Sequence, residues 1–348
     1  MRLTAKTISV ASLSVAVAAL AIGLWLYWHG AYIALCLTNH DVSAAEREPY
    51  EKASLRLAED MVHGNLNEVY SQTTADAKRT TTSAQLAALR QAYNRSMTTL
   101  VPLQVTHTYL LRSLSGAGNN RIVLCPAVAS GTISRPEDQV FVAMKAGGEQ
   151  AHIVVEGGSN NTTWNFVFWL MFEESAWRMQ DLYFGPAVMF GRSASDYWAQ
   201  AREQRGAGHM FNAAMLYAAA GGLAFRGPNF QLGIWREIQG EARNLRLPSE
   251  LEGEAPYLWQ FGSDSFRVLR VQPFFAGGET DLTIRTEVPS LNDAKRTDEL
   301  NHALIRHLTN SYPELFDSFA AIVVEAVEPG GVRSYRTVAY GRKAPSGR

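Results

Sequence analysis

Residues 164–184 read WNFVFWLMFEESAWRMQDLYF, and this stretch decides the fold. In an extended chain successive side chains point to opposite faces, and residues 164–172 carry apolar side chains on both of them. The acidic pair Glu173-Glu174 then indicates a turn before Trp177 opens a second strand. A strand that is apolar on both faces is buried on both, so helices must pack over one side of a curved sheet.

Further strands precede this hairpin, and helices precede the strands. The alternating pattern predicts strands at 103–111, 121–128, 139–145, 152–156, 164–172 and 177–184, separated by polar turn clusters rich in Gly and Asn. Upstream, helical spacing begins at Pro49, which suits a first helical turn, and Gly64 interrupts it. A short segment follows at 66–70, and Ser83 predicts the N-cap of another helix. Helices followed by antiparallel strands predict an α+β domain.

Two stretches carry a resemblance to a known superfamily. Residues 57–70, LAEDMVHGNLNEVY, and residues 168–179, FWLMFEESAWRM, are similar to the opening helices and the closing hairpin of NTF2-like domains, the cone-shaped SnoaL and ketosteroid-isomerase type. The likeness covers about residues 48–187. It implies a strongly bent antiparallel sheet whose concave face forms a pocket or binds protein.

The rest of the chain predicts two further pieces, for which we recognise no family. Residues 191–248 predict a helical linker bundle: one helix capped by Ser193 or Ser195, a second at 209–220 stopped by Gly221-Gly222, and a third capped by Asn229. Residues 249–348 predict a ββαββ α+β domain with strands at 266–271, 281–287, 321–327 and 333–340 and a helix capped by Asn292 or Asp293. The predicted domains are 1–40, 41–190, 191–248 and 249–348.

The first predicted piece is a membrane anchor. Residues 8–28, from Ile8 to Trp28, contain no charge. About 20 apolar residues in a helix span the hydrocarbon layer of a bilayer. Arg2 and Lys6 precede the segment, so the positive-inside rule predicts a single-pass inner-membrane protein with its N-terminus in the cytoplasm and its body in the periplasm.

A cleaved signal peptide is the alternative to an anchor. Ala16 and Ala18 satisfy a small-x-small cleavage site, and cleavage would give a secreted protein. The product would begin with the apolar residues 19–28, which is unusual, so we favour the anchor.

Composition excludes two classes of protein. Hydrophobic residues make up 47% of the 348-residue chain and charged residues 19%, which is too apolar for a disordered chain. The net charge is -1 and no basic stripe is present, so we expect no nucleic-acid partner.

The chain has two cysteines, Cys36 and Cys125. Two are too few for a disulfide scaffold, and their spacing does not bind zinc. We favour two unpaired thiols over a bridge, although the sequence leaves the pairing open.

Established catalytic signatures are missing. The sequence contains no phosphate-binding loop of the Walker type, no Gly-x-Ser-x-Gly elbow and no His-Glu-x-x-His pair. His302 and His307 are five residues apart, which places their side chains about 140° apart around a helix and excludes a shared metal ion. We therefore expect no metal and no cofactor.

Four residues are candidates for chemistry in the cone: Asp181, Tyr183, His107 and His152. A carboxylate in an apolar cup has a raised pKa suited to general acid-base catalysis. Alternation along residues 177–183 predicts that Trp177, Met179, Asp181 and Tyr183 share one face. If that face is the concave one, Asp181 acts as the acid or base, with Tyr183 or His107 as its hydrogen-bond partner. If the face is convex, these residues are solvated, and the sequence leaves this choice open.

Three functions are consistent with this reading. The leading hypothesis is a membrane-anchored, extracytoplasmic binding or assembly module of a bacterial envelope, non-catalytic, with an envelope protein or a second copy as its partner. The second is a small-molecule enzyme of the isomerase or hydratase type that uses the candidate carboxylate. The third is a structural spacer in an envelope machine.

Overall fold

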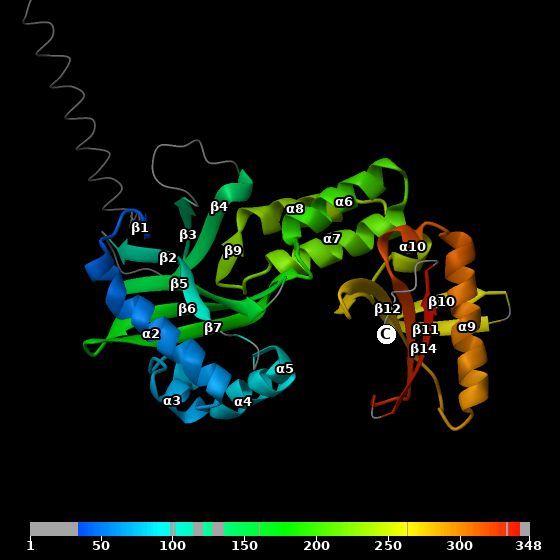
Figure 1. Ribbon diagram of the computed structural model, residues 1–348, viewed down its shortest axis with the longest axis horizontal. Helices are drawn as coiled ribbons and strands as arrows, with labels where there is room; N and C mark the ends of the chain where they lie inside the picture. The colour runs from blue at the N-terminus through cyan, green and yellow to red at the C-terminus, as the bar shows by residue number, and fades with distance from the viewer. Residues whose placement is uncertain are drawn as a thin grey trace, which may run out of the picture. The chain divides into compact units, whose positions relative to one another are not determined.

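A computed structural model describes residues 34–97, 100, 102–113, 121–126, 136–159, 161–262, 264–331 and 333–341 (Figure 1). It is a mixed α+β fold, which confirms the predicted class. The chain divides into two compact units: Met1–Gly157 with Asn165–Phe184 and Arg226–Gly233, and Gly158–Trp164 with Gly185–Phe225 and Ile234–Arg348. These bounds differ from the predicted domain pieces. The predicted anchor at 8–28 lies outside the described residues, and among the helices that are described none has the length and hydropathy to cross a bilayer.

A six-stranded sheet runs through the first unit. Its strands are β1 (Ala34–Thr38), β2 (Leu103–Ser113), β5 (Glu149–Ser159), β6 (Thr162–Glu173), β7 (Ala176–Met189) and β8 (Arg192–Ser193), in the order β1-β2-β5-β6-β7-β8. β7 continues into the second unit, where β8 pairs with its end. β1 lies inside the range assigned to the anchor piece and pairs antiparallel with β2. The range 34–38 therefore belongs to the folded body.

Helices α2 (Ala44–His63), α3 (Leu66–Ser71), α4 (Ser83–Ala92) and α5 (Asn94–Met97) belong to the same unit. Two predicted starts are wrong. Ser43 caps α2, so Pro49 lies inside the helix and not in its first turn. Thr82, and not Ser83, caps α4 through a capping box with Gln85.

Strand β6 is buried on both faces, as its sequence predicts. On the helical side, the Phe166 ring lies 4.6 Å from that of Phe184, which in turn lies 5.3 Å from Tyr93 at the end of α4. On the other side, Val167 joins an apolar cluster with Val142 and Phe230. Val142 and Phe230 come from a second sheet, ordered β3-β4-β9. Its strands are β3 (Arg121–Pro126), β4 (Gln139–Met144) and β9 (Phe230–Leu232), the last of which the sequence did not predict.

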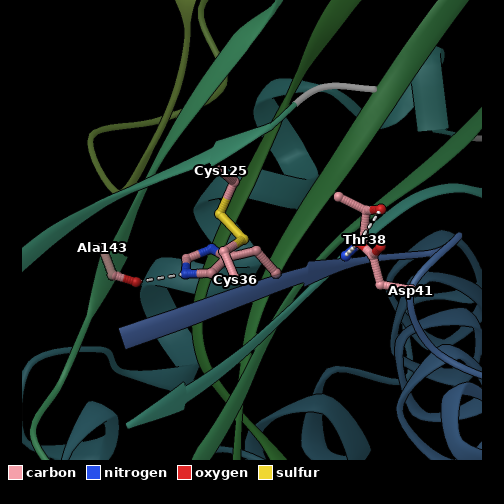
Figure 2. Close-up of a disulfide and its surroundings, with 6 residues drawn as sticks. Cys36, Thr38, Asp41, Cys125 and Ala143 are labelled. Carbon is pink, nitrogen blue, oxygen red and sulfur yellow. Dashed lines mark hydrogen bonds between the residues drawn. A yellow bond between two sulfur atoms is a disulfide. The ribbon is translucent and has the colours of Figure 1, made fainter. Parts of the chain in front are cut away.

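The two cysteines form a disulfide, so the preference for unpaired thiols is wrong (Figure 2). Cys36 on β1 and Cys125 on β3 have Cα atoms 5.5 Å apart, within the range that a disulfide bridges. Cys125 is fully buried in the apolar cluster that lies between the two sheets. The pairing follows from the packing of the two sheets, which the spacing in sequence did not reveal.

Three helices open the C-terminal part: α6 (Ala194–Gly206), α7 (Met210–Ala224) and α8 (Gly233–Arg243). Ser193 caps α6 together with Asp196, which confirms one of the two predicted caps. Two expectations are wrong. α7 continues through Gly221-Gly222 instead of stopping there, and α8 begins at Gly233, so Asn229 does not cap it.

The last part of the second unit is a five-stranded sheet, ordered β10-β11-β12-β13-β14. Its elements are β10 (Tyr257–Phe261), β11 (Asp264–Ala276), β12 (Glu279–Glu287), α9 (Ala294–Ser311), α10 (Leu315–Ser318), β13 (Ala321–Val327) and β14 (Ser334–Tyr340). Asp293 caps α9, and the crossover through α9 makes β12 and β13 parallel. The predicted order of these strands and of the long helix is present, preceded by β10, which was not predicted. The buried side chains Leu304 and Leu308 of α9 pack on one face of the sheet with Ile284 and Val324.

Short 3-10 turns complete the fold at Ala77–Arg79, Pro136–Asp138 and Ser249–Leu251.

Candidate functional site

Three of the four candidate residues line one cavity within the first unit. This polar cavity is bounded by His152, Val167, Trp169, Asp181, Tyr183, Arg226, Gly227, Asn229 and Phe230. β5, β6 and β7 supply the first five residues, and the segment 226–230, which runs into the first residue of β9, supplies the rest. The structure thus brings His152 of β5 together with Asp181 and Tyr183 of β7.

His152 is a neutral, buried member of the cavity wall. Its side chain is 1% exposed, and its ring stacks on Trp169 with the centroids 5.2 Å apart. The Nε2–H group donates a hydrogen bond of 2.7 Å to the carbonyl oxygen of Ala143, drawn as a dashed line in Figure 2. Burial lowers the pKa of His152 to about 4, and the bond to Ala143 opposes this only in part. At neutral pH Nδ1 therefore carries a lone pair, and this atom is buried without a hydrogen-bond partner.

Asp181 uses both carboxylate oxygens within the protein. Oδ2 accepts a hydrogen bond of 2.6 Å from the Nδ2 group of Asn229, and Oδ1 accepts one of 2.9 Å from the backbone N–H of Leu182. Asn229, predicted as a helix cap, instead holds this carboxylate. These two interactions fix the orientation of the Asp181 carboxyl group.

Arg226 brings a positive charge close to Tyr183, and the sequence reading missed it. The Arg226 side chain is 8% exposed. Burial lowers the pKa of its guanidinium, while Tyr183 and Glu156 act in the opposite direction. Burial also raises the pKa of the Tyr183 phenol, which stays neutral at physiological pH, and Arg226 opposes this shift. An arginine remains protonated in such a site.

Gly227 allows this segment to approach β7. Its φ is 96°, in the left-handed region, and a Cβ atom there would lie 2.9 Å from the Cβ atom of Tyr183. Glycine therefore meets both the conformational and the steric demand at this position. The sequence alone does not reveal this role of Gly227, because its neighbour Tyr183 lies on β7, far away along the chain.

His107 does not join the polar cavity. Its side chain is exposed, and its Nδ1 atom lies 3.1 Å from the hydroxyl oxygen of Thr106. A β-bulge between Val105 and His107 interrupts the pairing of β2 with β5. The geometry therefore offers Asn229 and Leu182, and not His107, as the partners of Asp181.

The prediction that four alternating residues of β7 share a face is wrong. The Trp177 ring lies 5.1 Å from that of Tyr50 on α2, whereas Tyr183 packs into the cluster between the two sheets. Phe184, at an even position, packs against Tyr93 at the end of α4, on the same helical side as Trp177. The alternation is therefore interrupted between Trp177 and Phe184. Met179 and Leu182 line a groove with residues of α4.

That groove is larger than the polar cavity. It has a volume of about 220 Å³ and is lined by Thr73, Ala77, Thr81, Gln85, Leu86, Leu89, Met179, Gln180, Asp181 and Leu182. Thr74 donates a hydrogen bond of 2.8 Å to the side-chain oxygen of Gln180 in its wall. Asp181 lines both spaces, so it lies between the groove and the polar cavity.

The size of the polar cavity limits its chemistry. It leaves about 10 Å³ for the centre of a water molecule, which is close to the minimum that one water requires. A substrate does not fit there in this conformation. Within the described ranges, no three His, Cys, Asp or Glu residues are grouped so that they could hold a metal ion.

Comparison with known proteins adds no relative. No protein-family model matches the chain, and no curated protein or solved structure shows significant similarity to it.

Proposed function

We propose that this chain is a membrane-anchored binding or assembly module that acts outside the cytoplasm of a bacterium and is not catalytic. The Cys36–Cys125 disulfide is the observation that carries this proposal. Disulfides form and persist in oxidising compartments such as the periplasm and are rare in the cytosol.

The leader and the disulfide support the same location independently. The uncharged residues 8–28 follow Arg2 and Lys6, a pattern typical of an N-terminus in the cytoplasm and a body across the membrane. Cys36 lies only a few residues beyond this segment, so an oxidised Cys36 agrees with a chain that has already left the bilayer. Cleavage after Ala18 would give the same compartment but a secreted body.

The geometry of the polar cavity does not favour catalysis. A general acid or base needs a proton-transfer partner in a space that admits the substrate. Asp181 is instead held by Asn229 and Leu182, beside a cavity that has room for about one water.

We also propose the NTF2-like assignment for residues 48–187. Helices α2 to α5 come first, and the sheet formed by β2, β5, β6 and β7 follows, as that resemblance implies. The inserted strands β3 and β4 and the preceding β1 are additions to the expected plan. In this assignment the β3-β4-β9 sheet occupies part of the face that would form the pocket.

An isomerase or hydratase type of enzyme is the second candidate. The convergence of His152, Asp181 and Tyr183 favours it, together with the groove of about 220 Å³ that reaches Asp181. The Asp181→Asn variant keeps the size of the side chain and removes its charge. If the enzyme hypothesis holds, this variant abolishes turnover of a small apolar carbonyl compound and Gln85→Ala weakens binding of that compound.

One experiment in intact cells tests the leading proposal. The full chain is fused at its C-terminus to alkaline phosphatase or to a fluorescent protein that folds only in the cytosol, and the membranes are washed with sodium carbonate. We expect an active phosphatase, a dark fluorescent fusion and a chain that stays in the membrane pellet.

The partner is then identified by crosslinking before detergent extraction. We expect one envelope protein or a second copy of the chain in stoichiometric amount. A cytosolic fluorescent signal would contradict the proposed location, and a body that stays monomeric without any crosslinked partner would contradict the binding role.

A further inference from the structure

Three exposed apolar side chains lie on two neighbouring edge strands of the first unit. Leu35 on β1 is 43% exposed, and Ile122 and Leu124 on β3 are 56% and 53% exposed. β1 ends the six-stranded sheet and β3 ends the three-stranded one. We call these three residues the β1–β3 patch. Single exposed leucines are ordinary, but a group of them on unpaired strand edges marks an interaction surface.

The disulfide holds the patch together. β1 and β3 lie side by side, with the Cα atoms of Cys36 and Cys125 5.5 Å apart (Figure 1). Leu35 and Leu124 each adjoin one of these cysteines. With 3.8 Å between consecutive Cα atoms, their own Cα atoms are separated by about 13 Å at most. On β3, Val123 and Cys125 pack into the core, so Ile122 and Leu124 point outward.

We infer that the β1–β3 patch rests on the periplasmic face of the inner membrane, the membrane that holds the proposed anchor. This inference rests on the proposed function and adds a second lipid contact, made by the folded body. Six residues lie between Trp28, the end of the predicted anchor, and Leu35, and even a fully extended chain of that length reaches only about 25 Å. Leu124 lies at most about 13 Å further away because the disulfide joins β1 to β3, so the chain keeps the patch within about 38 Å of the end of the anchor.

Lipid suits the patch by its chemistry as well as by its position. Apolar side chains gain free energy when they enter the boundary between headgroups and acyl chains.

Site-specific photocrosslinking tests the inference on the full chain. A benzophenone amino acid replaces Leu35, Ile122 or Leu124, one at a time, in protein reconstituted into nanodiscs of phosphatidylethanolamine and phosphatidylglycerol. Leu258 on β10 is the matched control, because it is an apolar residue on an edge strand, is 68% exposed and belongs to the other unit. Non-reducing electrophoresis checks that each variant keeps the Cys36–Cys125 bridge.

We expect several-fold more lipid adduct at positions 35, 122 and 124 than at 258. Equal adduct at all four positions, or adducts with a second protein at the patch in native membranes, would overturn the inference. A carbonate wash of the native membranes distinguishes failure of the lipid contact at the patch from failure of the proposed anchor. A chain that stays in the pellet without lipid adducts contradicts only the patch, whereas release of the chain contradicts the anchor itself.

Discussion

At the scale of single residues, the polar cavity is built from groups that burial and hydrogen bonds hold in place. His152 is neutral because burial disfavours its charged form, and Arg226 stays charged despite burial. Asp181 is fixed by two hydrogen bonds. Such an arrangement specifies the packing of the 226–233 segment against β7 and β5, and it makes the fold sensitive to pH.

His152 predicts a loss of stability in acid. Its pKa is about 4 in the folded protein and near 6.5 when unfolded. Since the unfolded chain binds the proton more readily, the contribution of His152 is complete above about pH 6.5 and is lost as the pH falls towards 4. Between pH 7 and pH 4.5 we expect a loss of about 2 kcal/mol in the free energy of unfolding from this group.

Urea unfolding of the detergent-solubilised chain at the two pH values measures this effect. The His152→Phe variant is less stable at pH 7 but loses less stability in acid than the wild type. His63→Phe serves as the control, since His63 at the end of α2 is exposed and outside the cavity. An unchanged pH dependence in His152→Phe would contradict the assignment of a neutral buried imidazole.

Gly227 predicts a steric effect of a single methyl group. Gly227→Ala places a Cβ atom 2.9 Å from Tyr183 at a φ of 96°, so we expect a destabilisation of about 1–3 kcal/mol. Gly240→Ala is the control, because nothing lies within 4 Å of its added Cβ in α8, where alanine favours the helix. Thermal unfolding compares the Gly227→Ala and Gly240→Ala variants. Equal melting temperatures would show that the segment 226–233 is not closely packed on β7.

At the scale of elements, regular alternation and helical periodicity predicted most of the strands and helices, and packing between distant segments produced the misses. β9 has three residues and exists because it pairs with β4. α7 continues through Gly221-Gly222 because it is buried on most sides. The strands that carry His152, Asp181 and Tyr183 were predictable from the sequence, but Arg226 was not, since it reaches the cavity from the loop after α7.

The disulfide between β1 and β3 predicts a contribution to the stability of the fold. It closes a loop with a sequence separation of 89 residues, and removing such a bridge costs about 2–5 kcal/mol. We expect the Cys36→Ser/Cys125→Ser double variant and the reduced wild type to unfold at the same, lower denaturant concentration. A midpoint equal to that of the oxidised wild type would show that β1 does not depend on the bridge.

At the scale of the whole molecule, we propose a body that folds after export and stays tied to the membrane by its first residues. The described part supplies an α+β fold with a bridge near its N-terminal end. That bridge and the charge pattern around residues 8–28 support the proposed location. The location stays a prediction from hydropathy and charge. The sequence did not predict the bridge, because two cysteines 89 residues apart carry no signal of pairing.

The oxidation state of the cysteines in living cells tests this central claim most directly. Cells are quenched with acid, and the denatured chain is treated with a maleimide-linked polymer before and after reduction. Because Cys36 and Cys125 are the only cysteines of the chain, we expect no shift in electrophoretic mobility before reduction and a shift by two polymers after it. Modification of both thiols before reduction would show a reduced chain and contradict an oxidising, extracytoplasmic location of the body.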